Sequence, residues 1–335
     1  MMILKTSRSN LSSNDQLALD LPFAETKSLT ARVGPTPTFT RSSTATFIGS
    51  NGLIQSAEIN EPRFEHDPLT GVCYGLLLEQ SRTNLVFPSA TLTTQTRTVT
   101  AVAHTLSFYG TGTVVLSGAH SATVIGTGAF PTRTILTFTP TAGSLVLTVT
   151  GTVTEAQLEA GATATSYIPT TTGSLARSQD LYTITGANFT DMYNQNEGTV
   201  FYAVRAVGAT NAQSTVFGVH GAIRSNGAIS AEFTGPFLRN TVSATGSTTQ
   251  ASLSNTASRN TLVKSAFAVR TDDFASSING SIATDTSGTL VTIMDRFVIG
   301  ANGNSGGPQV GNTIFSSVQY YRKRLPNPKL QALTQ

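Results

Sequence analysis

Short segments in which apolar and polar residues alternate recur along the chain. Alternation of this kind places every second side chain on the same face of a strand, and it predicts half-buried β-strands. It is clearest over residues 198–206, 264–270 and 314–322, and Asn279–Gly280 predicts the tight turn of a hairpin spanning 274–282. The pattern therefore predicts an all-β protein.

A second group of strands is expected in the middle of the chain. Residues 87–170 contain short runs rich in β-branched residues, each bounded by Gly or Pro turns. The runs are residues 105–109, 113–117, 123–125, 134–139 and 144–150. Closely spaced short strands of this kind predict a small β-sandwich or jelly roll.

The two ends of the chain give weaker signals. Residues 1–35 lack sustained periodicity, apart from alternation over 17–23 that predicts one short strand, and we expect them to form an extended arm that docks onto a partner. Near the other end, Asn327 followed by Pro328 predicts the N-cap and first turn of a short helix.

Charged residues make up only 12% of the chain, about half the usual share, so Ser, Thr, Asn and Gln must supply the polar surface. The net charge of +3 is small, and the basic cluster at 322–324 with Lys329 lacks the aromatic residues typical of nucleic-acid binding. There is no run of about 18 apolar residues to span a membrane and no apolar stretch typical of a signal peptide. We expect neither a nucleic-acid partner nor membrane insertion.

Catalytic chemistry is weakly represented. Cys73 is the single cysteine, which precludes an internal disulfide or a cysteine metal cage, and the four histidines are scattered. The 18 acidic residues are spread thinly, so no segment suggests the carboxylate pair of a glycoside hydrolase. Asp272, Asp273 and Asp285 are weak candidates for calcium, because adjacent aspartates cap a turn equally well. We expect no catalytic residue, cofactor or metal.

Three segments in the first quarter of the chain closely resemble a module of tailed-bacteriophage surface proteins. They are Thr38-Phe-Thr-Arg-Ser-Ser-Thr-Ala-Thr46, Asn60-Glu-Pro-Arg-Phe-Glu-His-Asp-Pro68 and Gly75-Leu-Leu-Leu-Glu-Gln-Ser-Arg-Thr-Asn-Leu85. The resemblance implies that residues 36–86 form an attachment module. Its candidate residues are Arg41, Arg63, Phe64, Glu79, Arg82 and Asn84. We expect ion pairs that fix the module's shape to come from Arg63, Glu65, Glu79 and Arg82.

Two further resemblances follow along the chain. Gln157-Leu-Glu-Ala-Gly-Ala-Thr-Ala-Thr-Ser-Tyr-Ile-Pro-Thr170 is similar to the last strand of carbohydrate-module-like jelly rolls in phage structural proteins. Residues 198–335 resemble a concanavalin A or laminin-G type sandwich. One departure is that longer phage relatives carry Trp-rich sugar modules, whereas this chain has no Trp.

Sugar recognition commonly uses aromatic rings and amides. Without Trp the stacking rings would have to be Tyr, such as Tyr109, Tyr193 or Tyr202, which are expected instead in a sandwich core or at its rim. Asn302 and Asn304, in a Gly-rich loop, are the candidate glycan contacts.

The expected organisation is a docking arm (1–35), the attachment module (36–86), the small sandwich (87–170), a linker (171–197) and a concanavalin A/laminin-G-like sandwich (198–335). The resemblance implies a non-enzymatic structural protein of a tailed-phage virion, made in the host cytoplasm and assembled as a homotrimer. We expect a capsid spike or decoration protein, bound to capsid or tail proteins through its N-terminal region, with the C-terminal sandwich outward. The alternative is a tail fibre or tail spike that recognises a host surface glycan.

Overall fold

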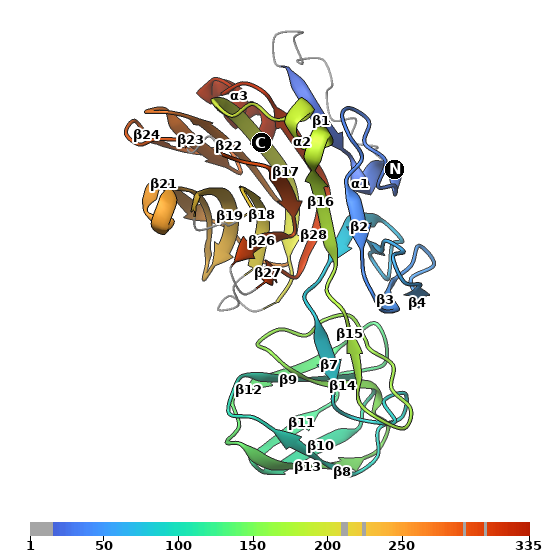
Figure 1. Ribbon diagram of the computed structural model, residues 1–335. Coiled ribbons are helices and arrows are strands. Elements are labelled where there is room, and N and C mark those ends of the chain that lie inside the picture. Colours follow the sequence, from blue (N-terminus) through green and yellow to red (C-terminus); the bar gives the residue numbers. More distant parts are fainter. Residues whose placement is uncertain (1–15, 209–213, 223–225, 291–292, 305–306) are drawn as a thin grey trace.

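The computed structural model describes residues 16–208, 214–222, 226–290, 293–304 and 307–335. These residues form a large β-sandwich lobe and a smaller β-sandwich lobe, joined by a narrow pair of strands (Figure 1). The prediction of an all-β protein built from sandwiches is confirmed.

One layer of the large lobe is a sheet with the order β24-β23-β22-β17-β28-β6-β5. One edge of β28 pairs with two different strands: β6 pairs with its residues 313–315, and β1 pairs with its residues 318–321. The strands are β1 (Leu17–Leu21), β5 (Phe64–His66), β6 (Cys73–Leu78), β17 (Glu197–Ala206), β22 (Val263–Arg270), β23 (Phe274–Ile278), β24 (Ser281–Asp285) and β28 (Thr313–Tyr321). The three strongest alternating segments thus become the adjacent strands β22, β17 and β28.

The opposite layer is a sheet with the order β2-β16-β25-β18-β19-β20-β21. Its strands are β2 (Thr38–Thr40), β16 (Leu181–Thr185), β18 (Ser214–His220), β19 (Ala228–Thr234), β20 (Phe237–Ser243), β21 (Thr249–Thr256) and β25 (Arg296–Ile299). A 3-10 turn at Thr245–Ser247 joins β20 to β21. Tyr202 and Phe297 meet the ring of Phe217 edge-on between the layers, with centroids 5.5 and 5.7 Å away. This apolar contact holds the two sheets together.

Three helices flank the large lobe within the described residues: α1 (Phe23–Thr26), α2 (Gly186–Met192) and α3 (Asn327–Thr334). Helix α3 covers the outer face of β22 and β23, where Leu330 is fully buried. The predicted helix is confirmed, but its N-cap is Pro326, and Asn327 is the first helical residue without a side-chain cap. The carbonyl of Pro326 already accepts the N–H groups of Lys329 and Leu330, at 2.9 and 3.1 Å, so the helix starts one residue earlier than predicted.

Two small hairpins complete the large lobe. Strands β3 (Ala45–Ile48) and β4 (Ile54–Ala57) enclose a turn that contains Asn51 and Gly52, and β26 (Ala301–Asn304) pairs with β27 (Gly307–Val310) next to β18. The hairpin predicted at Asn279–Gly280 joins β23 to β24, and both turn residues have positive φ angles of 48° and 83°. Those angles match a tight two-residue hairpin turn.

The small lobe packs a sheet with the order β11-β10-β13-β8 against a sheet with the order β12-β9-β14. Its core is apolar and separate from that of the large lobe, with Leu106, Leu116 and Leu147 fully buried. The strands are β8 (Gln95–Val99), β9 (His104–Tyr109), β10 (Thr113–Gly118), β11 (Ala122–Ile125), β12 (Thr134–Phe138), β13 (Gly143–Thr150) and β14 (Thr154–Ala160). Every strand predicted in this region is present, and β8 is an additional one.

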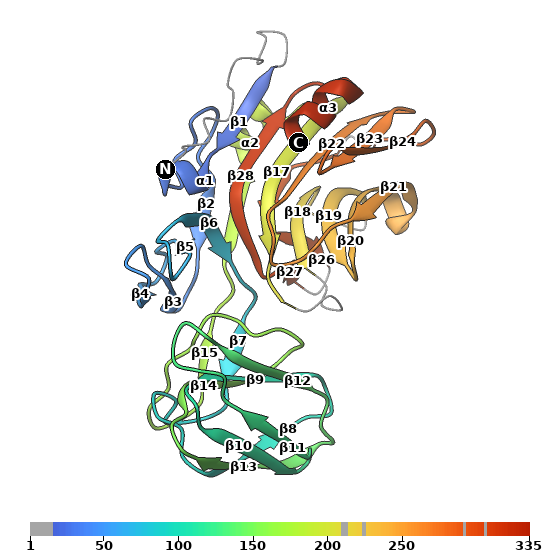
Figure 2. The same cartoon turned by 180° about the vertical axis from the view of Figure 1, so that it is seen from behind.

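The lobes are connected by β7 (Arg82–Asn84) and β15 (Leu175–Arg177), which pair with each other in the waist of the molecule (Figures 1 and 2). The small lobe is therefore an insertion between β6 and β16 of the large lobe. This corrects two expected boundaries. Residues 36–86 are not a separate module, and 171–197 is not a linker, because their strands complete sheets of the large lobe. Alternation predicts that a strand forms but not which strand it joins.

The structure describes only the second part of the expected docking arm, because residues 1–15 lie outside the described residues. The strand predicted over 17–23 is present as β1, and it pairs with β28 of the same chain. The N-terminal strands and the C-terminal sandwich consequently share one lobe. Which part of the molecule faces outward on a particle remains a prediction. No helix among the described residues is long and apolar enough to cross a lipid bilayer.

Candidate functional site

A cluster of charged side chains is buried where the large lobe meets the waist. It contains three guanidinium groups and two carboxylates, each on a residue that is at most 3% exposed. Arg41 follows β2, Arg63 precedes β5, Glu79 follows β6, Arg177 ends β15, and Asp180 precedes β16. We call these five residues the junction cluster. Its members come from strand ends of both sheets and from the waist, so they lie together only in the folded chain.

Asp180 lies at the centre of the junction cluster. Its Oδ1 accepts a hydrogen bond from Arg41 at 3.1 Å, and its Oδ2 accepts one from Arg63 at 2.6 Å. The backbone N–H of Glu79 also donates to Oδ2, at 2.8 Å. One carboxylate thereby ties together segments from three different parts of the chain.

Glu79 connects the cluster to the small lobe. Its Oε2 accepts hydrogen bonds from Arg63 and from the Ser166 hydroxyl, both at 2.7 Å, and its Oε1 accepts the Ser166 N–H at 2.8 Å. Arg177 lies 3.5 Å from the same carboxylate. Burial favours the neutral acid, but the charges of Arg177 and Arg63 and the bonds from Ser166 outweigh it and lower the pKa of Glu79 to about 2.

The guanidinium groups respond to the same environment. Burial opposes the charge on Arg63, yet the carboxylates of Asp180 and Glu79 raise its pKa above the ordinary value. Burial dominates at Arg41 and lowers its pKa, despite the charge of Asp180. Buried ion pairs of this kind add little net stability over apolar packing, but losing one partner costs about 3–5 kcal/mol. The cluster therefore enforces one arrangement of the junction.

Asn84 forms a second connection, inside the small lobe. Its Nδ2 donates to the carbonyls of Ala156 and Ile168 at 3.0 and 2.9 Å, and its Oδ1 accepts from the N–H groups of Val86 and Leu158 at 3.2 and 3.1 Å. The side chain is fully buried and uses both of its polar atoms. Asn84 thus binds the Arg-Thr-Asn-Leu segment to the Gln-Leu-Glu segment that follows it in the small lobe.

The Gln157–Thr170 segment is folded back on itself. Glu159 accepts hydrogen bonds from the N–H and hydroxyl of Thr165 at 2.9 and 2.8 Å and from Gln157 at 2.7 Å. Gln157 in turn accepts the N–H of Ile168 at 2.7 Å. Together with the bonds from Asn84, these contacts join residues 75–85 and residues 157–170, which carry separate sequence resemblances, into one hydrogen-bonded unit.

The predicted attachment residues have different surroundings. Arg41, Arg63 and Glu79 belong to the junction cluster. Two of the four residues expected in ion pairs, Arg63 and Glu79, pair with each other at 2.7 Å. Arg82 instead lies 3.6 Å from Glu159. Phe64 is partly buried against the core of the large lobe. Whether any of these residues contacts another protein remains a prediction.

The predicted role of Glu65 in an ion pair was wrong. Its Oε2 accepts the N–H of Ile48 at 3.0 Å, and His66 contacts the carbonyl of the same residue at 3.1 Å, so the pair holds the β3–β4 hairpin against β5. Burial, with the nearby charge of Glu79, raises the pKa of Glu65 to about 7 despite the bond from Ile48.

Arg177, Asp180 and Ser166 were not predicted from the sequence. Arg177 and Asp180 lie in the segment expected to be a linker, and Ser166 lies in the segment expected to end a jelly roll. A signal was available, because two opposite charges three residues apart stand out in a chain with 12% charged residues.

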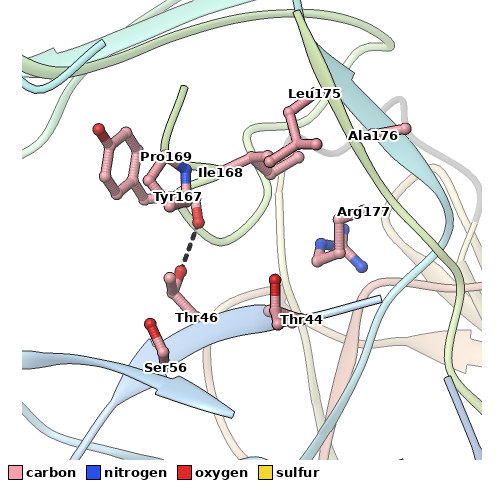
Figure 3. A pocket seen from close by; sticks show the side chains of 10 residues that line it. Thr44, Thr46, Ser56, Tyr167, Ile168, Pro169, Leu175, Ala176 and Arg177 are labelled. Atoms are coloured by element: carbon pink, nitrogen blue, oxygen red, sulfur yellow. Dashed lines mark hydrogen bonds between the residues drawn. The ribbon is translucent and has the colours of Figure 1, made fainter. Parts of the chain in front are cut away.

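A cavity of about 20 Å³ lies beside Arg177, enough for roughly one water molecule. Figure 3 shows Thr46 and Tyr167 hydrogen-bonded to each other on its wall, with Arg177 on the other side. A wider, open hollow of about 530 Å³ lies at the rim of the large lobe. It is lined by exposed hydroxyl and amide side chains, including Thr256, Ser258 and Asn279.

The side chains considered for sugar or calcium binding have structural surroundings. Tyr109, Tyr193 and Tyr202 are 6%, 8% and 0% exposed, which confirms their expected place in a core or at its rim. The side chains of Asn302 and Asn304 lie outside the described part of the structure. Asp273 pairs with Arg270 and Arg324. Among the described residues, no group of three His, Cys, Asp or Glu side chains is placed to hold a metal ion.

Comparison with known proteins finds no matching family model and no matching curated sequence. Among solved structures, the binding domain of botulinum neurotoxin serotype D/C matches with 14% identity and a TM-score of 0.38, over 47% of this chain and 40% of its own length. The CBM40 of the Ruminococcus gnavus IT-sialidase matches with 17% identity and a TM-score of 0.38, over 44% of this chain and 88% of its own. The chain spans less than half the length of the neurotoxin domains it matches. At these TM-scores the matches bear on neither ligand nor activity.

Proposed function

We propose that this chain is a non-enzymatic structural protein of a tailed-phage virion, a spike or decoration protein of the capsid. The observation that carries the proposal is the junction cluster. Arg41, Arg63 and Glu79 come from the three segments that resemble phage surface proteins, and all three side chains are buried and bonded within the chain. Groups engaged in this way build a rigid two-lobed body, whereas a catalytic group must reach a substrate.

The proposed attachment is through the large lobe. Strands β1, β2, β5 and β6, all from the N-terminal part of the described chain, belong to that lobe. A protein held there presents its small lobe to the exterior, because the small lobe lies at the far end of the waist (Figure 1). The low charge suits contacts made through apolar area and strand edges rather than through salt bridges.

The test is a cryo-electron-microscopy map of the phage particle at side-chain resolution. We expect density for this chain on the capsid lattice, with the large lobe against the shell and the small lobe outward. Absence of the chain from the particle refutes the virion role, and a location at the tail tip refutes the decoration role.

The open hollow favours a second candidate function, recognition of a host surface glycan by a tail protein. Hydroxyl and amide groups such as those of Thr256, Ser258 and Asn279 suit hydrogen bonds to sugar hydroxyls. The check is binding to immobilised bacterial surface polysaccharides by the chain and by Ser258→Trp, which fills the hollow. Retention equally strong for both proteins excludes this site.

A further inference from the structure

The outward face of the β11-β10-β13-β8 sheet in the small lobe has an unusual composition. Strand β10 points Thr113, Val115 and Ser117 outward, and β13 points Val146, Thr148 and Thr150 outward, while the residues between them enter the core. The outward positions of β8 and β11 are threonine or isoleucine as well. We call this surface the threonine face. It carries no charged side chain among these strands' outward positions.

The register makes the face regular. Val115 lies opposite Thr148 on one side and Thr123 on the other, and Ser117 lies opposite Val146. Val115 and Val146 therefore lie beside hydroxyl-bearing side chains of the neighbouring strands. Threonine and valine are stiff about χ1, so packing them against a partner loses little side-chain entropy.

The threonine face lies at the free end of the molecule. Both views place the sheet of β8, β10, β11 and β13 farthest from the large lobe, with the β9, β12 and β14 sheet between them (Figures 1 and 2). No other described part of the chain stands in front of it. A second molecule can therefore approach the face end-on.

We propose that the threonine face is a contact surface between two copies of this chain, packed face to face about a twofold axis. In a contact about a twofold axis the same surface patch occurs on both partners, so a net charge on the patch would face a like net charge. A face without charges avoids that repulsion, and Val115, Val146 and Ile125 supply apolar contact. The inference does not depend on the proposed virion role, since it rests on this face alone.

The size of the face sets the expected strength. Four strands about 4.8 Å apart, with six residues at about 3.3 Å each, cover roughly 400 Å². That is about half of what each partner contributes to a standard stable interface. We therefore expect weak pairing in solution, with a dissociation constant of roughly 10⁻⁵ to 10⁻³ M.

The experiment is sedimentation equilibrium of the full chain from about 10 μM to 1 mM. We expect the average mass to rise with concentration from that of the 35.1 kDa monomer toward twice that value. Val115→Lys should remain monomeric over the same range. The matched control is Ile135→Lys, which alters another exposed aliphatic residue (53%, against 39% for Val115) on β12 of the opposite sheet. It should associate like the unmodified chain.

Three outcomes overturn the proposal. These are a monomer at 1 mM, association that Val115→Lys leaves unchanged, and association that Ile135→Lys abolishes as completely as Val115→Lys does. Circular dichroism verifies that each variant is folded. If Val115→Lys is not, Thr148→Glu on the neighbouring strand replaces it, with the same expected loss of association. A trimer that Val115→Lys leaves unchanged is one case of the second outcome.

Discussion

Asp180→Asn tests the junction cluster with the smallest change of shape. The substitution keeps the size of the side chain but removes the charge that faces Arg41 and Arg63. It also turns an amide N–H toward a guanidinium group in place of an accepting oxygen. The cluster would then hold three guanidinium groups against the single carboxylate of Glu79.

The magnitude follows from the contacts that Asp180 makes. It accepts hydrogen bonds from Arg41 at 3.1 Å, from Arg63 at 2.6 Å and from a backbone N–H at 2.8 Å, and it is 1% exposed. Breaking a buried pair so that one charge stays unpaired costs about 3–5 kcal/mol. Asn retains one accepting oxygen, so we expect a loss of about 4 kcal/mol in the free energy of unfolding. That is a large part of the stability of an ordinary domain.

The assay is urea unfolding at pH 7 followed by circular dichroism, with hydrogen exchange read strand by strand because two lobes need not unfold together. We expect faster exchange in β7, β15 and β16, while the β10–β13 ladder is unchanged. Asp191→Asn is the control, because Asp191 is exposed, and it should change stability by less than about 0.5 kcal/mol. A loss below about 1 kcal/mol for Asp180→Asn would show that the cluster does not fix the junction.

Three further changes test other parts of the structure. The pKa of Glu65 is raised to about 7, so the folded state holds a proton that the unfolded state releases near pH 4.5. The free energy of unfolding should therefore fall by up to about 3 kcal/mol as pH rises from 4.5 to 7. Glu65→Gln should flatten that slope in urea titrations at several pH values. Asn84→Ala leaves four buried backbone groups without their partner and should cost about 3 kcal/mol, seen by calorimetry as a lower melting temperature of the small lobe; an unchanged transition contradicts the role of Asn84. Gly75 has φ +129°, and a Cβ there would lie 1.9 Å from the carbonyl oxygen of Phe315. Gly75→Ala should therefore lower the free energy of unfolding in urea by more than about 3 kcal/mol. Gly173 has open space around it, so the control Gly173→Ala should lower it by less than about 1 kcal/mol.

Local patterns in the sequence predicted local structure well. The strands of the small lobe, the Asn279–Gly280 turn and the helix beginning near Pro328 all depend on residues close together in the chain. Alternation and turn chemistry are local properties, so they can be read without knowing the fold. The helix starts one residue earlier than predicted, because the carbonyl of Pro326 accepts its first backbone hydrogen bonds.

Partnership between distant segments could not be predicted in the same way. Arg63 and Glu79 were both expected to form ion pairs, because they lie only 16 residues apart in the segment that resembles the phage module. Asp180 lies more than 100 residues from both. Its spacing from Arg177 makes it stand out in the sequence but does not indicate which distant residues it contacts. Register across a sheet is set by tertiary packing, so the insertion of the small lobe and the completion of the large lobe by β1 and β6 appear only in the structure.

The pairing of β1 with β28 has a consequence for how the protein is made. Leu19 and Tyr320 are partners about 300 residues apart, so at roughly 5–20 residues per second the ribosome needs about 15–60 s to supply the second strand after the first. The small lobe is built from one continuous segment and can fold during that interval. The earliest described strand of the large lobe can bond early only to the nearby residues 32–33. Its other edge waits for β28 throughout and is open to wrong partners until β28 emerges.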